Sequence, residues 1–227
     1  HPGAVPLVAI VGLGVLLRVG WIAAFPTEVE LDFARYHRFA VHLASGEHGP
    51  LLYVQVLLHE VGYPLSLSGA YVLAGAEASV GRALNVLLAA WLILVVHRVL
   101  ALSGEKAALT GALLIAVWPS HVALSSVLAS ENLFLPLLWS GVGFALETSP
   151  RRSAIGGALL GSAQAVRPPA ALMLGLLVVG SLVRRRWIGA VALAAGAAVS
   201  FAAYLVVRHG TGDPFARGAV GYSVLMG

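Results

Sequence analysis

The sequence predicts an all-α polytopic membrane protein with about seven transmembrane helices, on two observations. The 227-residue chain is 59% hydrophobic and only 11% charged, whereas a soluble domain carries about 25% charged residues. Its apolar residues also form long runs whose lengths approach the roughly 20 residues that a helix needs to cross a bilayer. Water is therefore not the main solvent of this chain.

Seven apolar runs qualify as spans, although the third, fifth and sixth are short. In chain order they cover residues 7–25, 83–99, 107–118, 132–146, 153–166, 168–183 and 188–207. Because successive spans cross in opposite directions, the loops between them alternate between two faces of the membrane.

The short loops assign a side to each face. Basic residues follow the second, fourth and sixth runs, and an excess of Lys and Arg in short loops stays in the cytoplasm. These residues are Arg98, Lys106, Arg151, Arg152, Arg184, Arg185 and Arg186. We therefore expect this face in the cytoplasm and the protein in the plasma (inner) membrane.

The opposite, extracytoplasmic face receives segment 26–81, connection 119–130, turn 167–169 and the tail from residue 208. Eight of the ten carboxylates lie there, namely Glu28, Glu30, Asp32, Glu47, Glu60, Glu77, Glu131 and Asp213. Six histidines accompany them: His37, His42, His48, His59, His121 and His209. Any chemistry is expected on this outer side.

Segment 26–81, the first outer loop, contains one or two interfacial helices. Residues 31–44 predict an amphipathic helix. Its apolar face has Phe33, Tyr36, Ala40 and Leu43, and its polar face has Asp32, Arg35, His37 and Arg38. Residues 64–75 are too short to span and are expected at the surface too. No repeat or linker divides the chain, so residues 1–227 are expected to form a single membrane module.

Several kinds of site are excluded by composition. The chain has no cysteine, hence no disulfide, thiolate metal site or cysteine nucleophile. Its net charge is +4 and its pI about 9.9, but the basic residues form short clusters between apolar runs, so nucleic acid is not an expected partner. The outer histidines lack HxH or HExxH spacing, so no metal site is expected from them. No glycine-rich nucleotide loop occurs.

Asp32 begins the amphipathic helix shortly after the first span, so its carboxylate is held near the bilayer surface. It is either a general base or polar anchor for a reacting hydroxyl, or a first-turn or N-cap acid favoured by the helix dipole. Spacing alone favours the second interpretation.

Arg18 lies inside the first run, where an unpaired charge costs about 2.5 to 3.5 kcal/mol. It either pairs with Glu28, Glu30 or Asp32, reaches a lipid phosphate, or snorkels to the surface. Arg82 and Asn85 share one helix face near the outer end of the second span. They either pack helices or line a cavity.

Several landmarks follow one another along the chain: 30–36 (ELDFARY) with Ala40 and Gly46, 62–64 (GYP), 82–85 (RALN), 118–121 (WPSH), 130–134 (SENLF) and 164–168 (QAVRP). In this order they resemble the polyprenyl-phosphate-dependent glycosyltransferases of the GT-C superfamily, specifically bacterial relatives of protein mannosyltransferases and of the aminoarabinose transferase. No single landmark is specific, but the set covers essentially the whole chain.

The resemblance implies a GT-C-like membrane enzyme that transfers a sugar from a polyprenyl-phosphate donor to a lipid, glycan or protein acceptor on the extracytoplasmic side. Asp32 would be the base, and Arg167 would contact the departing phosphate. Glu131 would orient the acceptor, hold Arg167 or Arg82, or support a divalent cation; no other cofactor is implied. The remaining substrate-binding candidates are Arg18, Arg82, Tyr36, Tyr63, Asn85 and His121. Asp32 and Arg167 are expected to meet across one pocket.

The chain departs from this family in one respect, and other functions stay open. Relatives are usually longer, and the tail from residue 208 resembles only the start of their next outer loop, so a C-terminal portion is expected to be lacking. A transporter or lipid flippase, or a structural subunit of a larger complex, are the alternatives. Paired repeats and helices interrupted at the midplane would indicate a transporter, whereas the outer clustering of charges favours the enzyme.

Overall fold

The computed structural model describes residues 4–25, 27–46 and 61–210, and every regular element in these ranges is helical. The elements are α1 (Ala4–Ala24), α2 (Leu31–Ser45), α4 (Gly62–Ala74), α5 (Ala78–Leu100), a 3-10 turn (Ala101–Ser103), α6 (Glu105–Val117), α7 (Pro119–Leu124), α8 (Glu131–Leu146), α9 (Pro150–Val166), α10 (Ala170–Val183) and α11 (Trp187–Gly210). The all-α prediction is confirmed for this part of the chain. Glu47, His48, His59, Glu60, Asp213 and the side chain of His209 lie outside the described residues.

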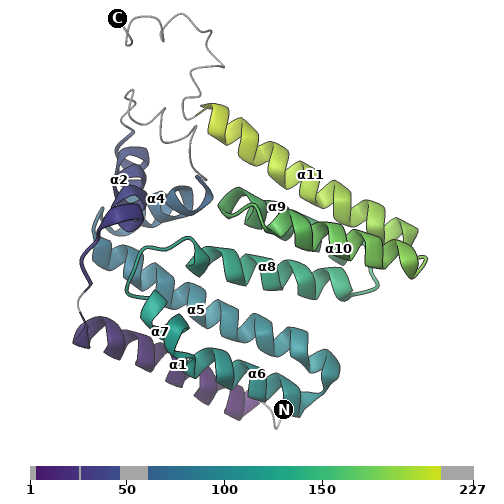
Figure 1. Ribbon diagram of the computed structural model, residues 1–227, viewed down its shortest axis with the longest axis horizontal. Helices are drawn as coiled ribbons and strands as arrows, with labels where there is room; N and C mark the ends of the chain where they lie inside the picture. Colours follow the sequence, from purple (N-terminus) through teal and green to yellow (C-terminus); the bar gives the residue numbers. More distant parts are fainter. Residues whose placement is uncertain (1–3, 26, 47–60, 211–227) are drawn as a thin grey trace, which may run out of the picture.

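Each of the seven predicted runs falls on a helix, namely α1, α5, α6, α8, α9, α10 and α11. These helices lie side by side and alternate in direction (Figure 1). One end of the bundle carries α2, α4 and α7 and is called the α4 end. The other end carries the connections after α5, α8 and α10 and is called the Glu147 end.

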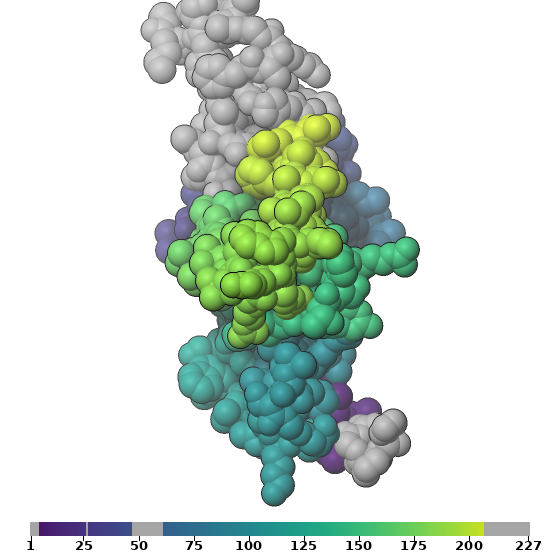
Figure 2. Space-filling view, turned by 90° about the vertical axis from the view of Figure 1, so that its right-hand side faces the viewer, coloured from purple at the N-terminus to yellow at the C-terminus, as the bar shows by residue number. Residues whose placement is uncertain are grey.

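Figure 2 views the molecule from the Glu147 end, where the colours pass from teal at α5 and α6 to yellow at α11. Three helical segments are long and apolar enough to cross a membrane: Val5–Ala24, Ala78–Ser103 and Trp187–Val206. The other apolar helices are shorter; the 13 residues of α6 rise only about 20 Å. Helix length therefore supports a membrane protein with three candidate spans and does not by itself bear out seven.

The outward sides of the long helices are apolar. Leu16 of α1, Leu87 of α5 and Val199 of α11 are 71%, 68% and 72% exposed. Apolar side chains on the outward side of a helix are compatible with contact to lipid tails, where their exposure is not unfavourable.

Helices α9 and α11 approach through small residues. A Cβ atom at Gly157 would collide with the carbonyl oxygen of Leu193, and one at Gly196 with that of Ala154. Glycine therefore permits a backbone-to-backbone contact that any larger residue would prevent, as in helix pairs with small residues four apart.

A hydrophobic cluster joins α2 and α4 to the bundle. Its buried members are Ala40, Tyr63, Leu67, Tyr71, Leu88, Leu128, Leu133 and Val166. Phe33 and Tyr36 pack against it, so most of the apolar face predicted for α2 is turned inward. His37, which we placed on the polar face, instead contacts Tyr71 of α4. Phe39 is buried in a separate cluster with Val61, Ala165 and Tyr204, so α2 is packed on more than the one face that the sequence indicated.

Candidate functional site at the α4 end

Glu131 and Arg167 form an ion pair at the α4 end. Glu131 is the first residue of α8 and Arg167 follows the last residue of α9. Nη1 of Arg167 donates to Oε1 of Glu131 at 2.5 Å, and the two side chains are 41% and 37% exposed. Among the residues that the structure describes, the other nitrogens of this guanidinium donate to no protein group. Of the roles left open for Glu131, holding Arg167 is the one that the contacts match.

Tyr63 lies buried between this pair and α2. Its hydroxyl donates to Oδ1 of Asn85 at 3.0 Å, and its ring meets that of Tyr36 edge-on with centroids 5.6 Å apart. Burial raises the pKa of Tyr63, and Tyr71, Tyr36 and Glu131 raise it further. Tyr63 therefore keeps its proton and links α2 electrostatically to Glu131.

Asp32 lies in the first turn of α2, with its side chain 69% exposed. Its Oδ1 accepts from Nη2 of Arg35 at 3.0 Å. Since residues four apart share a helix face, Asp32 lies one turn from Tyr36 on the side that faces Tyr63. The structure thus pairs Asp32 with Arg35 rather than Arg167, and a meeting of Asp32 and Arg167 across one pocket stays a prediction.

The backbone just before Asp32 is strained. Leu31 has a φ of 50°, in the left-handed region that costs a non-glycine residue about 1–2 kcal/mol, and its side chain is exposed. This conformation sets the direction in which the chain enters α2, and so the direction of the Asp32 carboxylate.

Arg82 and Asn85 of α5 bind main-chain carbonyls of the segment before α2 and of the connection between α7 and α8. Arg82 donates from Nε to the carbonyl of Ser126 at 3.0 Å and from Nη2 to the carbonyl of Thr27. Asn85 donates from Nδ2 to the carbonyls of Ser125 and Val127 at 3.3 and 2.8 Å and has no exposed surface. Of the two roles left open for Asn85, helix packing or lining a cavity, the contacts match packing: its amide joins α5 to Tyr63 of α4 and to the connection after α7.

Asn132 is a functionally placed polar residue that the sequence reasoning missed. Its Nδ2 donates to the carbonyls of Leu124, Val127 and Ala129 at 3.1, 3.3 and 3.2 Å. The available signal was an asparagine inside an otherwise apolar run, directly after Glu131.

Arg18 is 1% exposed and binds main-chain oxygens instead of the predicted partners Glu28, Glu30, Asp32 or a lipid phosphate. Nη1 donates to the carbonyls of Gly14 and Ala116, each at 2.9 Å, and Nη2 to that of Ile115 at 3.1 Å. The last two oxygens belong to the final turn of α6. Pro119 has no N–H to offer to the carbonyl four residues before it, so Arg18 satisfies carbonyls that the helix end leaves free.

His121 of α7 lies beside Arg18. Together with Glu131 and Asn132 they line a cavity of about 10 Å³, close to the size that one water molecule needs. Burial lowers the pKa of His121, and the charge of Arg18 lowers it further. The imidazole is therefore neutral, and Arg18, His121 and Glu131 face one small cavity.

A groove of about 400 Å³ opens beside the pair, between α4, α8, α9 and α11. Leu65, Leu133 and Leu137 give it an apolar wall, and the hydroxyls of Ser162 and Ser200 bond to each other at 2.9 Å within it. Ala165 and Val166 also line it, and Arg167 follows them directly in the chain.

Within residues 4–25, 27–46 and 61–210, no group of three or more His, Asp or Glu side chains is placed to hold a metal ion. No protein-family model, curated protein or solved structure matches the chain. Fold and site define an all-helical protein with three helices able to cross a membrane. At the α4 end they define a partly exposed ion pair of Arg167 with Glu131, and an apolar groove whose lining includes the two residues before Arg167.

Proposed function

We propose that the protein is an integral membrane glycosyltransferase that moves a sugar from a polyprenyl-phosphate donor to an acceptor hydroxyl at the α4 end. The observation that carries the proposal is the place of Arg167. Glu131 holds this guanidinium one residue after Val166, which lines the apolar groove, and within the described part of the chain its other two nitrogens donate to no protein group. An apolar chain that ends in a phosphate has the complementary chemistry.

In the proposed reaction, the acceptor oxygen attacks the anomeric carbon while Asp32 takes its proton. The bond between the anomeric carbon and the phosphate oxygen breaks, and the electron pair leaves with the polyprenyl phosphate. Arg167 donates to this oxygen as its negative charge develops, which favours the transition state over the ground state. A positioned base contributes about 10² to 10⁴ in rate.

The remaining parts of the proposal concern placement. The seven helices that carry the apolar runs would cross the bilayer. Helices α2 and α4 would lie at its surface, and the α4 end would face the extracytoplasmic side of the plasma membrane. The basic residues Arg98, Arg151, Arg152 and Arg184 of the Glu147 end support this orientation. Arg18 supports the enzyme over a transporter, because its donors bind carbonyls and line no open path.

The test is donor consumption by the protein in liposomes, with undecaprenyl-phosphate mannose and undecaprenyl-phosphate aminoarabinose as donors and envelope lipids as acceptors. We expect release of undecaprenyl phosphate. The variants Asp32→Asn and Arg167→Gln should each lower its rate by about 10² or more. Glu30→Gln is the matched control, since Glu30 is an exposed acid two residues from Asp32 with no side-chain cap bond.

Movement of intact donor across the bilayer without release of undecaprenyl phosphate would instead identify a flippase. Full activity of Asp32→Asn would remove Asp32 as the base. Activity that requires a second, co-purifying polypeptide would make this chain a subunit.

A further inference from the structure

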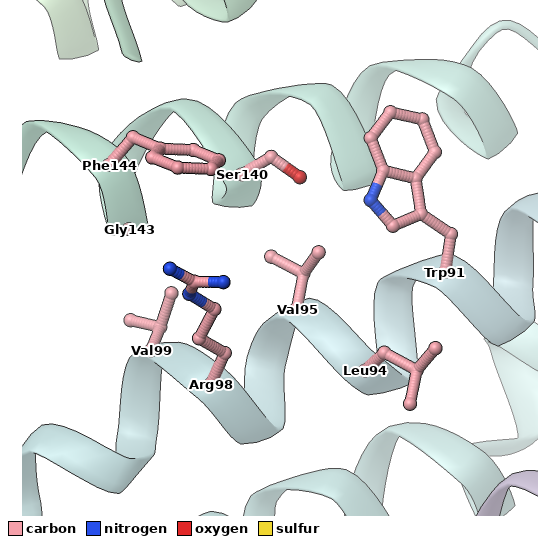
Figure 3. A pocket seen from close by; sticks show the side chains of 8 residues that line it. All are labelled: Trp91, Leu94, Val95, Arg98, Val99, Ser140, Gly143 and Phe144. Atoms are coloured by element: carbon pink, nitrogen blue, oxygen red, sulfur yellow. The ribbon is translucent and has the colours of Figure 1, made fainter. Parts of the chain in front are cut away.

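A second cavity lies near the Glu147 end, between α5 and α8, with a volume of about 240 Å³ (Figure 3). Trp91, Val95 and Arg98 line it from α5, and Ser140 and Phe144 from α8. The hydroxyl of Ser140 and the indole nitrogen of Trp91 point into the space between the two helices, and the guanidinium of Arg98 lies beneath the ring of Phe144 (Figure 3). The cavity is at the opposite end of the bundle from Arg167, so it is independent of the proposed transfer chemistry.

Among the residues that the structure describes, none is a hydrogen-bond partner of the Ser140 hydroxyl. Ser140 is 6% exposed, and its Oγ is buried without a hydrogen bond. A helical serine commonly donates to the carbonyl four residues before it, which here belongs to Pro136, but this bond is not made. A buried hydroxyl without a partner is unfavourable. It therefore indicates an acceptor that enters the cavity from outside the chain.

The mouth of the cavity carries excess positive charge. Arg98 donates from Nη2 to Oε1 of Glu147 at 3.0 Å, Arg152 pairs with Oε2 of Glu147, and Arg186 donates to its carbonyl oxygen. Two guanidinium groups thus share a single carboxylate, and a third binds the main chain of the same residue. Arg98 is also 59% exposed and stands 5.1 Å from the ring centroid of Phe144, which fixes its direction. An anionic group at this mouth would complete the charge balance.

We infer that this cavity binds an anionic glycerophospholipid. Its phosphate lies at Arg98, an ester carbonyl accepts from Ser140, and an acyl chain lies along Trp91 and Val95. A free phosphate would satisfy Arg98 but leave the apolar wall and the Ser140 hydroxyl without a contact. Basic pockets between transmembrane helices bind anionic head groups through the same combination of charge and apolar contact.

Native mass spectrometry of the purified protein in detergent, titrated with dioleoyl phosphatidylglycerol, tests this site. We expect one tightly retained lipid, and at least about tenfold weaker retention of dioleoyl phosphatidylcholine. Arg98→Gln should weaken binding by about tenfold or more, and Ser140→Ala by about threefold to tenfold. Arg184→Gln is the matched control, because Arg184 is an exposed arginine of the same end that does not line the cavity; its binding should equal that of the wild type.

The loss of Arg98 also breaks its pair with Glu147, so the thermal unfolding midpoint of each variant is measured without lipid. If Arg98→Gln unfolds early, Ser140→Ala decides, since this change leaves the pair intact. Equal retention of the two lipids, wild-type retention by Ser140→Ala, or displacement of phosphatidylglycerol by millimolar inorganic phosphate would each overturn the inference.

Discussion

Arg18 of α1 donates a hydrogen bond from Nη1 to the carbonyl oxygen of Ala116, at the last turn of α6, over a distance of 2.9 Å. The charge of an arginine inside a candidate membrane span is thus directed at the negative end of a neighbouring helix dipole. This contact replaces the capping that Pro119 prevents, and it ties α1 to α6.

We predict that Arg18→Leu lowers the free energy of unfolding by about 1–3 kcal/mol, because two buried carbonyls lose their donor. Thermal unfolding in detergent measures the change. Leu16→Met is the control, since Leu16 is exposed on the same helix, and its midpoint should stay unchanged. An unaltered midpoint for Arg18→Leu would show that these carbonyls find other donors.

Asn85 and Tyr63 should be energetically coupled. We predict a loss of about 1–3 kcal/mol for Asn85→Ala, which deprives the carbonyls of Ser125 and Val127 of their donor, and a smaller loss for Tyr63→Phe. The double variant should lose less than the sum, because the bond between the two side chains at 3.0 Å can be lost only once. Additive losses in unfolding experiments would contradict this coupling.

The close contact of α9 and α11 predicts strong sensitivity at Gly157. Gly157→Ala should lower the free energy of unfolding by about 2 kcal/mol or more, and with it the unfolding midpoint, because its Cβ would meet main-chain atoms that cannot rotate away. Gly175→Ala in α10 is the matched control; a Cβ there has nothing within 4 Å, and alanine favours a helix over glycine by up to about 1 kcal/mol. Equal midpoints for the two variants would refute the predicted contact.

Stability should fall as the solution becomes acidic. Burial lowers the pKa of His37 below its usual 6.5, and burial and Arg18 lower that of His121. The unfolded chain then binds more protons than the folded protein as the pH falls below about 6.5, so stability is full above this pH and is lost below it. His37→Gln should reduce the slope of the unfolding midpoint between pH 7 and pH 5; an unchanged slope would rule out a contribution from His37.

The ion pair of Glu131 and Arg167 allows a positioning role to be distinguished from a direct role in the proposed sugar transfer. If Glu131 only positions Arg167, Glu131→Gln should lower the rate of undecaprenyl phosphate release by about tenfold, whereas Arg167→Gln should lower it by about 10² or more. The control Glu77→Gln, at an exposed acid of the same end, should leave the rate unchanged. Equal losses for the first two variants would mean that Glu131 itself contacts substrate.

The helical segments could be predicted from the sequence alone. Helices depend on neighbours three and four residues apart and on continuous apolar runs, so the seven runs, the amphipathic segment at 31–44 and the short segment at 64–75 all coincide with helices. It also placed Glu131 and Arg167 at ends of helices that alternate in direction, and hence at one end of the bundle.

The contacts between side chains of different helices could not be predicted in this way. Arg18 contacts carbonyls almost a hundred residues away. Arg82 binds carbonyls before α2 and after α7, and Glu131 pairs with Arg167 rather than with Arg82. These choices depend on how far each helix slides and turns against its neighbours, which close contacts such as that of Gly157 with Leu193 set. Periodicity in a sequence fixes the face of a helix, but the depth and rotation of its packing follow from the surfaces of several helices at once.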